Sequence, residues 1–188
     1  YINSGVLYIP IFMIYRILFL FALSVTPLLS AAQERVVVTD PEIKFSYVLP
    51  EGWMVNDDGY DYKITAKSIA NAYIVLTYLE GAQGTGNFES IGSKQSFEQD
   101  LLFEIQYVLP EEFSNFKVQE NGTTTIDETP ARWVKFSYGA NGDNTGIFYM
   151  YQKLNQTFKI TGSAPASQFE KVKPIFKAIV DSFQAEKR

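Results

Sequence analysis

The sequence predicts an α+β domain in which helices sandwich an antiparallel β-sheet of about six to seven strands. Between Phe169 and Phe183, apolar residues recur at steps of three and four, which lines one helical face and requires a flat apolar surface beneath it. Short segments that alternate apolar and polar residues precede this helix and follow one another closely. Connections of this length favour antiparallel hairpins over parallel crossovers. The strands therefore supply the surface on which the helix lies.

The first half of the chain carries three segments typical of strands, at residues 43–49, 62–66 and 72–79. The third is apolar on both faces, as expected of a strand with helices on both sides of its sheet. Residues 33–41 are predicted as a lead-in. Asn56, Asp57, Asp58 and Gly59 are predicted to form a turn.

A second helix is predicted over residues 93–109, after a loop at 81–92, and Pro110 is expected to end it. Its apolar stripe consists of Phe97, Leu101, Leu102, Ile105 and Val108, widened by Phe103 and Tyr107. Four more strands are predicted after this helix, at residues 116–120, 131–138, 147–152 and 158–161.

Three signals in the second half predict turns or breaks. Asn121-Gly122 is the strongest short hairpin signal in the chain. Residues 162–165 predict a turn, because a proline at their end cannot donate to a continuing central strand. Pro174 falls inside the last helical pattern and predicts a kink there, or two helical pieces.

Residues 1–32 have the layout of a secretory signal peptide. They contain no acidic residue, Arg16 precedes an apolar run, and small residues end the segment. This pattern predicts cleavage between Ala32 and Gln33. Met13 would begin a more ordinary signal peptide.

The alternative for this segment is a retained membrane anchor. Its apolar run, residues 17–29, is shorter than the about 20 residues that a membrane-spanning helix needs. We therefore expect an exported protein, periplasmic or extracellular, with no stable membrane span after processing.

Composition excludes several classes of function. The net charge is −5, which argues against nucleic-acid binding, because phosphate contacts require clustered Lys and Arg. The chain has no histidine and no cysteine, so it lacks the commonest general base, the commonest metal ligand and any thiol nucleophile. A hydrolase would have to use carboxylates, Lys, Tyr or a metal held by oxygens. We expect no cofactor and no catalytic activity.

Two polar segments offer oxygen ligands for calcium. Asn141, Asp143, Thr145 and Gly146 fall at the spacing of a calcium loop, but its last position is Gln152, where such a loop needs a bidentate Glu. We therefore interpret this segment as a hairpin turn.

The second polar segment contains clustered carboxylates that could bind calcium weakly, with a solvated turn as the alternative. Its residues are Asn56, Asp57, Asp58 and Asp61.

Two acid pairs could serve general acid/base chemistry, Glu111-Glu112 and Asp127-Glu128. Neither lies in a segment that is predicted to be buried, so nothing separates the pKa values within a pair. We interpret both pairs as solvated surface.

Other candidate features also have structural interpretations. Residues 81–86 resemble a phosphate-binding loop but lack the Lys and Ser/Thr of a P-loop. Trp53 and Trp133 could line a ligand groove, although aromatic residues on sheet faces more often belong to a core.

Three motifs resemble the PsbP-like superfamily, which includes PsbP and the DcrB-like envelope proteins. They are F-x-Y-x-L-P-x-G-W at residues 45–53, A-R-W-x-x-F at 131–136, and G-x-A-P-x-x-x-F-x-x-x-x-P-x-F-x-x-I-x-x-S-F at 162–183. The resemblance covers residues 42–184 as one domain, with a tail at 185–188, and implies an α/β/α sandwich. Members mostly bind other proteins. The histidine-linked metal chemistry of PsbP does not transfer, because this chain has no histidine.

We therefore expect an exported, non-catalytic binding protein that interacts with another protein or an envelope component. The first alternative is a carrier of a small ligand or of calcium, and the second is a carboxylate-dependent hydrolase. The sequence assigns no catalytic, cofactor-binding or metal-binding residue, and it does not identify the partner or its surface.

Overall fold

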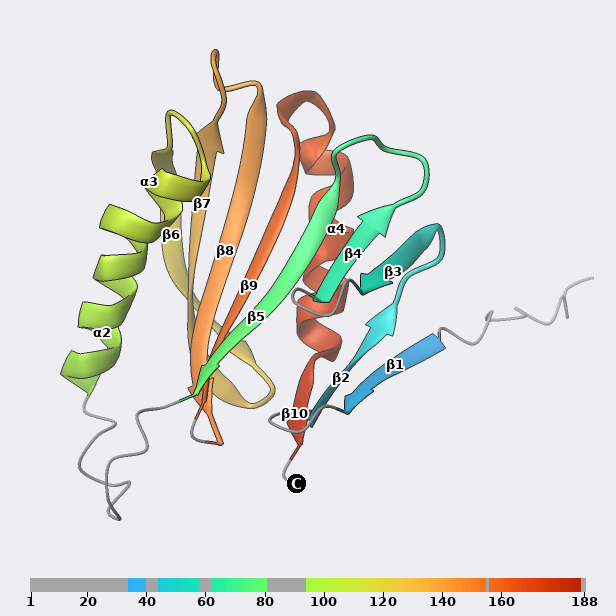
Figure 1. The fold of residues 1–188 in the computed structure, drawn as a ribbon, viewed down its shortest axis with the longest axis vertical. Helices are drawn as coiled ribbons and strands as arrows, with labels where there is room; N and C mark the ends of the chain where they lie inside the picture. The colour runs from blue at the N-terminus through green and yellow to red at the C-terminus, as the bar shows by residue number, and fades with distance from the viewer. Residues whose placement is uncertain (1–33, 40–43, 58–61, 81–93, 155, 187–188) are drawn as a thin grey trace, which may run out of the picture. The chain divides into compact units, whose positions relative to one another are not determined.

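A seven-stranded antiparallel sheet organises the fold (Figure 1). The computed structural model describes residues 34–39, 44–57, 62–80, 94–154 and 156–186. In spatial order the strands are β3 (Trp53–Asp57), β4 (Tyr62–Ala66), β5 (Tyr73–Glu80), β9 (Gln156–Pro165), β8 (Asn144–Lys153), β7 (Thr129–Tyr138) and β6 (Lys117–Ile126). Helices lie on both faces of this sheet, which confirms the predicted fold class.

A smaller antiparallel sheet contains β1 (Glu34–Thr39), β2 (Lys44–Leu49) and β10 (Gln184–Glu186), in the order β1-β2-β10. The predicted strand at residues 43–49 thus belongs to this sheet and not to the large one. The predicted lead-in contains β1 instead of irregular chain, because its run of valines and threonine suits a strand once β2 offers an edge.

The helix α4 (Ala166–Ser182) covers one face of the large sheet (Figure 1). Its buried residues follow the predicted three- and four-residue steps and are Phe169, Val172, Phe176, Ile179 and Val180. They pack in the larger of two cores, against inward-facing residues of β3, β4, β5, β8 and β9. The predicted helix and its buried face are confirmed.

A second helical layer covers the opposite face over β7 and β8. It consists of α2 (Lys94–Phe103), the π-helical turn η1 (Glu104–Val108) and α3 (Leu109–Glu112). Pro110 does not end this segment as predicted. It lies in α3, which continues directly from η1, so the helical segment runs past the proline to Glu112. None of the helices in the described residues combines the length and the hydropathy needed to span a membrane.

Strand β8 is buried on both faces. Ile147 and Tyr149 belong to the core under α4, whereas Phe148 and Met150 belong to the smaller core under α2 and α3. Strand β5 was predicted to be covered on both sides but is less enclosed, since the Leu79 side chain is 55% exposed.

Two ion pairs connect the second helical layer to the sheet. Arg132 Nη2 of β7 lies 2.5 Å from Glu98 Oε1 of α2. Lys159 of β9 donates to Glu104, which is buried in η1. Removing one partner of a buried ion pair destabilises the fold, because the other charge is then left buried without a partner. The Lys159–Glu104 pair therefore fixes η1 over β9.

The predicted turn at Asn121-Gly122 is wrong, because β6 continues through both residues. A Cβ at Gly122 would lie 2.9 Å from the Trp133 indole, so this glycine serves the close packing of Trp133. The chain turns instead at Asp127 and Glu128, with φ of 48° and 60°. Positive φ at both central residues is the geometry of a tight two-residue hairpin.

Residues 162–165 belong to β9 and form no turn. A Cβ at Gly162 would lie 2.9 Å from Phe176 Cδ2, so this glycine lets α4 approach the sheet closely. Pro165 ends β9 and is the N-cap of α4, where the helix loses no hydrogen bond. The helix α4 continues across Pro174, and the prediction of two helical pieces is wrong.

Candidate functional site

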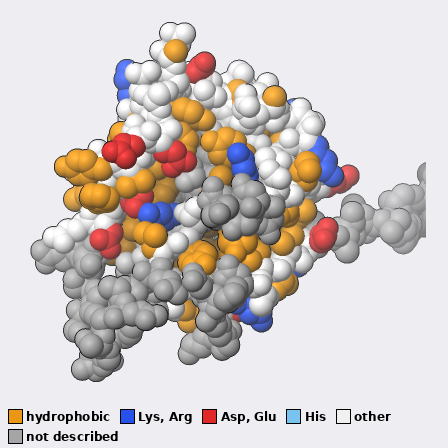
Figure 2. Space-filling view, viewed as in Figure 1, with side chains coloured by type: hydrophobic (Ala, Val, Ile, Leu, Met, Phe, Trp, Pro, Cys, Tyr) orange, Lys and Arg blue, Asp and Glu red, His pale blue; other side chains and the backbone are white. Residues whose placement is uncertain are grey.

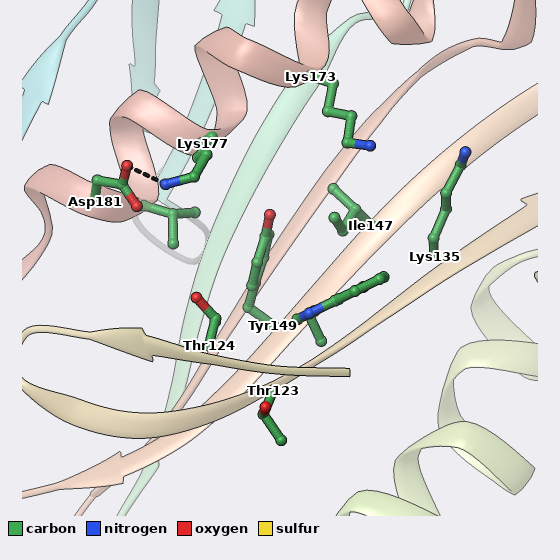
Figure 3. A pocket seen from close by; sticks show the side chains of 10 residues that line it. Thr123, Thr124, Lys135, Ile147, Tyr149, Lys173, Lys177 and Asp181 are labelled. Atoms are coloured by element: carbon green, nitrogen blue, oxygen red, sulfur yellow. Dashed lines mark hydrogen bonds and ion pairs between the residues drawn. The ribbon is translucent and has the colours of Figure 1, made fainter. Parts of the chain in front are cut away.

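A pocket of about 200 Å³ lies between α4 and the strands β6, β7 and β8 (Figure 3). It forms because α4 packs on β8 and β9, which leaves β6 and β7 beside the helix. Its lining consists of Thr123 and Thr124 from β6, Trp133 and Lys135 from β7, Ile147 and Tyr149 from β8, and Lys173, Lys177, Val180 and Asp181 from α4. The pocket therefore has an α4 wall, a β6 wall and a floor from β7 and β8.

The floor of the pocket is aromatic. The Trp133 indole packs over Gly122, which lies opposite it on β6. Tyr149 points its hydroxyl toward α4 (Figure 3). Burial, and secondarily the negative charge of Asp181, raises the pKa of Tyr149 to about 12. The hydroxyl thus stays protonated at neutral pH and can donate a hydrogen bond.

Three lysines give the pocket a positive lining. Lys177 Nζ lies 2.5 Å from Asp181 Oδ2, and Lys135 Nζ lies 3.3 Å from Glu170 Oε1. Lys173 has no ion-pair partner among the described residues. The Lys135 and Lys173 side chains extend toward the same region, one from β7 and one from α4 (Figure 3). An anionic group in the pocket would meet uncompensated positive charge at Lys173.

A second candidate is an exposed apolar surface on the other side of the sheet, which we name the α2–η1 patch. It consists of Leu102, Phe103 and Tyr107, which are 52%, 57% and 57% exposed. The Phe103 and Tyr107 rings lie 5.3 Å apart between centroids. Figure 2 shows hydrophobic side chains protruding over this helical layer.

The predicted apolar stripe is wrong in part, because it includes all three residues of the α2–η1 patch, and these are exposed. The stripe contains more apolar residues than one helical face can bury. The buried face contains Leu101 and Leu109, with Glu104 between them. The π-helical geometry of η1 adds to the interest of this surface, because such turns often occur at functional sites.

Three hydroxyl groups come together on the face of the sheet opposite α4. Tyr138 Oη lies 2.6 Å from Ser163 Oγ, and Ser163 is fully buried. Burial, followed by the charge and hydrogen bond of Tyr138, raises the pKa of Tyr73 to about 12. A phenol with so high a pKa is a poor base at neutral pH. This cluster is thus suited to holding β5, β7 and β9 together.

The acid pair Asp127-Glu128 has a structural role at the β6–β7 turn. Lys153 Nζ lies 2.7 Å from Asp127 Oδ2, and the Ala185 backbone N–H donates to the same oxygen at 2.8 Å. The Asp127 side chain is 11% exposed, so its predicted solvation is wrong. The reason is that the turn folds against β10, which the local sequence does not reveal.

The second acid pair lies on α3, where both glutamates are exposed. The first calcium candidate falls at the β7–β8 connection: Thr145 and Gly146 belong to β8, and Asp143 Oδ1 accepts from the Asn144 side chain. This agrees with its interpretation as a hairpin. Within the described part of the chain, no group of three or more acidic residues is placed to hold a metal ion.

The second calcium candidate is only partly described. Asn56 and Asp57 belong to β3, so these two residues do not form the predicted turn. Asp58 and Asp61 lie outside the described residues, as do the glycine-rich residues 81–86. The predicted cleavage site at Ala32 and Gln33 also lies outside them.

The two tryptophans have different roles. Trp53 is 5% exposed and packs edge-to-face on Phe176 at 5.8 Å, which makes it a core residue. Trp133 lines the pocket. The sequence reasoning missed Lys135, Lys173 and their pocket. The four-residue spacing of the two α4 lysines was the available signal, because such residues share one edge of a helix.

Comparisons with known proteins show similarity of fold. No family model matches the chain, and no curated protein matches it. The solution structure of cyanobacterial PsbP from Synechocystis is similar with a TM-score of 0.59 and 12% identity, covering 88% of this chain and 99% of that one. The crystal structure of LpqN, involved in cell envelope biogenesis of Mycobacterium tuberculosis, is similar with a TM-score of 0.55 and 14% identity, covering 83% and 92%. The chain therefore has the PsbP-like fold.

Proposed function

We propose that this chain is an exported, non-catalytic binding protein and that the α2–η1 patch binds its partner. The observation that carries the proposal is the exposure of Phe103 and Tyr107 beside each other on a helical layer. Contiguous exposed apolar side chains mark interaction surfaces, and aromatic residues are enriched where partners bind tightly.

The surroundings of the patch suggest the chemistry of the partner. Asp100 lies about one turn before Phe103, and Glu111 about one turn after Tyr107, and both acids are exposed. Complementary charge steers association and selects partners. We therefore propose a protein partner that presents an apolar segment flanked by Lys or Arg.

The absence of catalysis is proposed from the chemistry of the described side chains. Tyr73 and Tyr149 keep their protons at neutral pH, and the buried carboxylate of Glu104 is held in an ion pair. The sequence contains neither histidine nor cysteine. These features support binding over acid/base or nucleophilic chemistry.

Export is supported by the signal-peptide pattern and by the fold it shares with LpqN, a protein of cell envelope biogenesis. Intact mass of the protein purified from its native envelope tests this part. A chain that begins at Gln33 is the expected product, and a mass that retains residues 13–32 would overturn it.

Capture of a partner from native envelope extract tests the binding surface. We expect a Phe103→Ser, Tyr107→Ser variant to lose the partner that the unchanged protein captures, and capture to weaken as salt is raised. Met54→Ser is the matched control, because Met54 is 47% exposed on the edge strand β3. Equal capture by both variants, with equal urea midpoints, would contradict the proposed surface.

A further inference from the structure

The pocket beside α4 lies on the opposite face of the sheet from the α2–η1 patch, and it shares no residue with that patch. It is concave, with an apolar floor and a few converging polar groups, which is the usual composition of a ligand site. Its volume of about 200 Å³ is below the about 300–1,000 Å³ of sites for drug-sized molecules. A ligand would therefore be small.

The charge of the pocket differs from that of the whole chain, which carries −5. The lining contains three lysines and one carboxylate, Asp181, which Lys177 already neutralises. Two glutamates outside the lining pair with Lys135 at 3.3 and 3.7 Å. Lys173 is half-buried and has no ion pair among the described residues. The three lysines and these three carboxylates balance in number, and Lys173 is the ammonium group that is left to meet an anion.

The floor of the pocket favours an anion that carries a planar ring. Trp133 and Tyr149 provide aromatic surface, and Ile147 and Val180 add aliphatic surface. A bare inorganic anion would leave this surface without a partner, whereas a planar ring would stack on it. The Tyr149 and Thr124 hydroxyl groups supply hydrogen-bond donors beside the floor.

We propose that this pocket binds a small aromatic carboxylate, with its ring on Trp133 and its carboxylate at Lys173. The proposal adds a ligand site to the partner surface on the other face of the sheet. It requires no rearrangement, because both the aromatic floor and the lysine already line the same cavity.

Titration of the mature protein with benzoate, followed by the two tryptophan indole N–H resonances, tests the site. Trp133 lines the pocket and Trp53 is a core residue, so each protein sample contains its own reference signal. We expect a saturable shift of the Trp133 resonance at millimolar benzoate while the Trp53 resonance stays in place. Benzamide, which has the same ring and no charge, is expected to cause no saturable shift.

Two lysine variants separate the pocket from general attraction of anions. Lys173→Met removes the charge and keeps a helix-forming side chain, and we expect benzoate binding to weaken about tenfold. Lys171→Met is the matched control, because Lys171 is exposed on the same helix outside the pocket lining. It is expected to leave the affinity unchanged.

Three results would overturn the proposal. They are equal shifts with benzoate and benzamide, equal loss of affinity in the two lysine variants, and no saturable shift of Trp133 in a sample whose unfolding midpoint is normal. A Trp133 shift caused by an acidic peptide and not by benzoate would also overturn it, since the site would then recognise a protein segment. The Phe103→Ser, Tyr107→Ser variant is expected to bind benzoate normally, so failure of the partner surface and failure of this site are distinguishable.

Discussion

Replacing Phe176 by alanine should remove a fully buried side chain through which α4 packs on the sheet. The Phe176 ring is fully buried, and its centroid lies 5.8 Å from that of Trp53 and 6.2 Å from that of Phe169. Truncation of a buried Phe costs about 3–5 kcal/mol, and the loss of aromatic pairs places this site toward the upper end. Since a domain has only about 5–15 kcal/mol of stability, the effect should be large.

Urea unfolding of the mature protein measures this cost, with Lys177→Ala as the control. Lys177 lies one residue further along α4, is 66% exposed and forms an ion pair with Asp181. Its removal should change the free energy of unfolding by less than about 0.5 kcal/mol. Equal and small effects of the two substitutions would refute the packing of α4 described above.

Gly162 provides a second test of the same contact. A Cβ at this position would lie 2.9 Å from the Phe176 ring, so Gly162→Ala should overpack the interface at a cost of about 1–3 kcal/mol. In the Phe176→Ala background the added methyl group has space, and its cost should fall. Strict additivity of the two substitutions would contradict this account of the glycine.

Three further predictions concern buried polar groups and use the same unfolding assay. Tyr151→Phe should leave stability unchanged or raise it by about 1 kcal/mol, because the buried Tyr151 hydroxyl has no hydrogen-bond partner within the described residues; a clear loss would contradict this. Glu104→Gln should cost about 3–5 kcal/mol by leaving Lys159 buried without its partner, and adding Lys159→Met should recover part of it. The free energy of unfolding should fall as pH rises from 10.0 to about 12, because Tyr73 and Tyr149 keep their protons in the folded state over this range and release them in the unfolded chain. The Tyr149→Phe variant should show a smaller fall.

The sheet and α4 could be predicted from the sequence because apolar residues recur in them at regular intervals. The apolar steps between Phe169 and Phe183 admit only one buried helical face, and that face is the one observed. Alternation likewise located β7 and β9. The large sheet and its flanking helices follow from these local patterns.

The errors arose where a residue type served tertiary packing instead of local conformation. Gly122 signals a turn in sequence but serves the packing of Trp133, and Gly162 serves Phe176. Phe103 and Tyr107 are apolar at helical spacing, yet the face they occupy is the exposed one. Local patterns contain no information about which distant side chain fills the space above a glycine.

Most residues of the candidate sites could not be predicted from the sequence. The pocket joins Lys135 of β7 to Lys173 of α4, two residues whose proximity depends on how far α4 covers the sheet. Asp127 appeared solvated because its partners, Lys153 and the Ala185 backbone, come from later parts of the chain. To predict such sites, one must know how the helices and strands are arranged in space and not only which helices and strands form.

Photo-crosslinking in the native envelope tests the proposed binding surface most directly. A photoreactive phenylalanine analogue would replace Phe103 in one variant and Lys171 in another, since Phe103 belongs to the α2–η1 patch and Lys171 is exposed on α4 across the sheet. We expect a discrete protein adduct from position 103 that is absent from position 171 and is lost when Tyr107→Ser is added. Adducts of equal yield from both positions, or an adduct from position 171 alone, would contradict it.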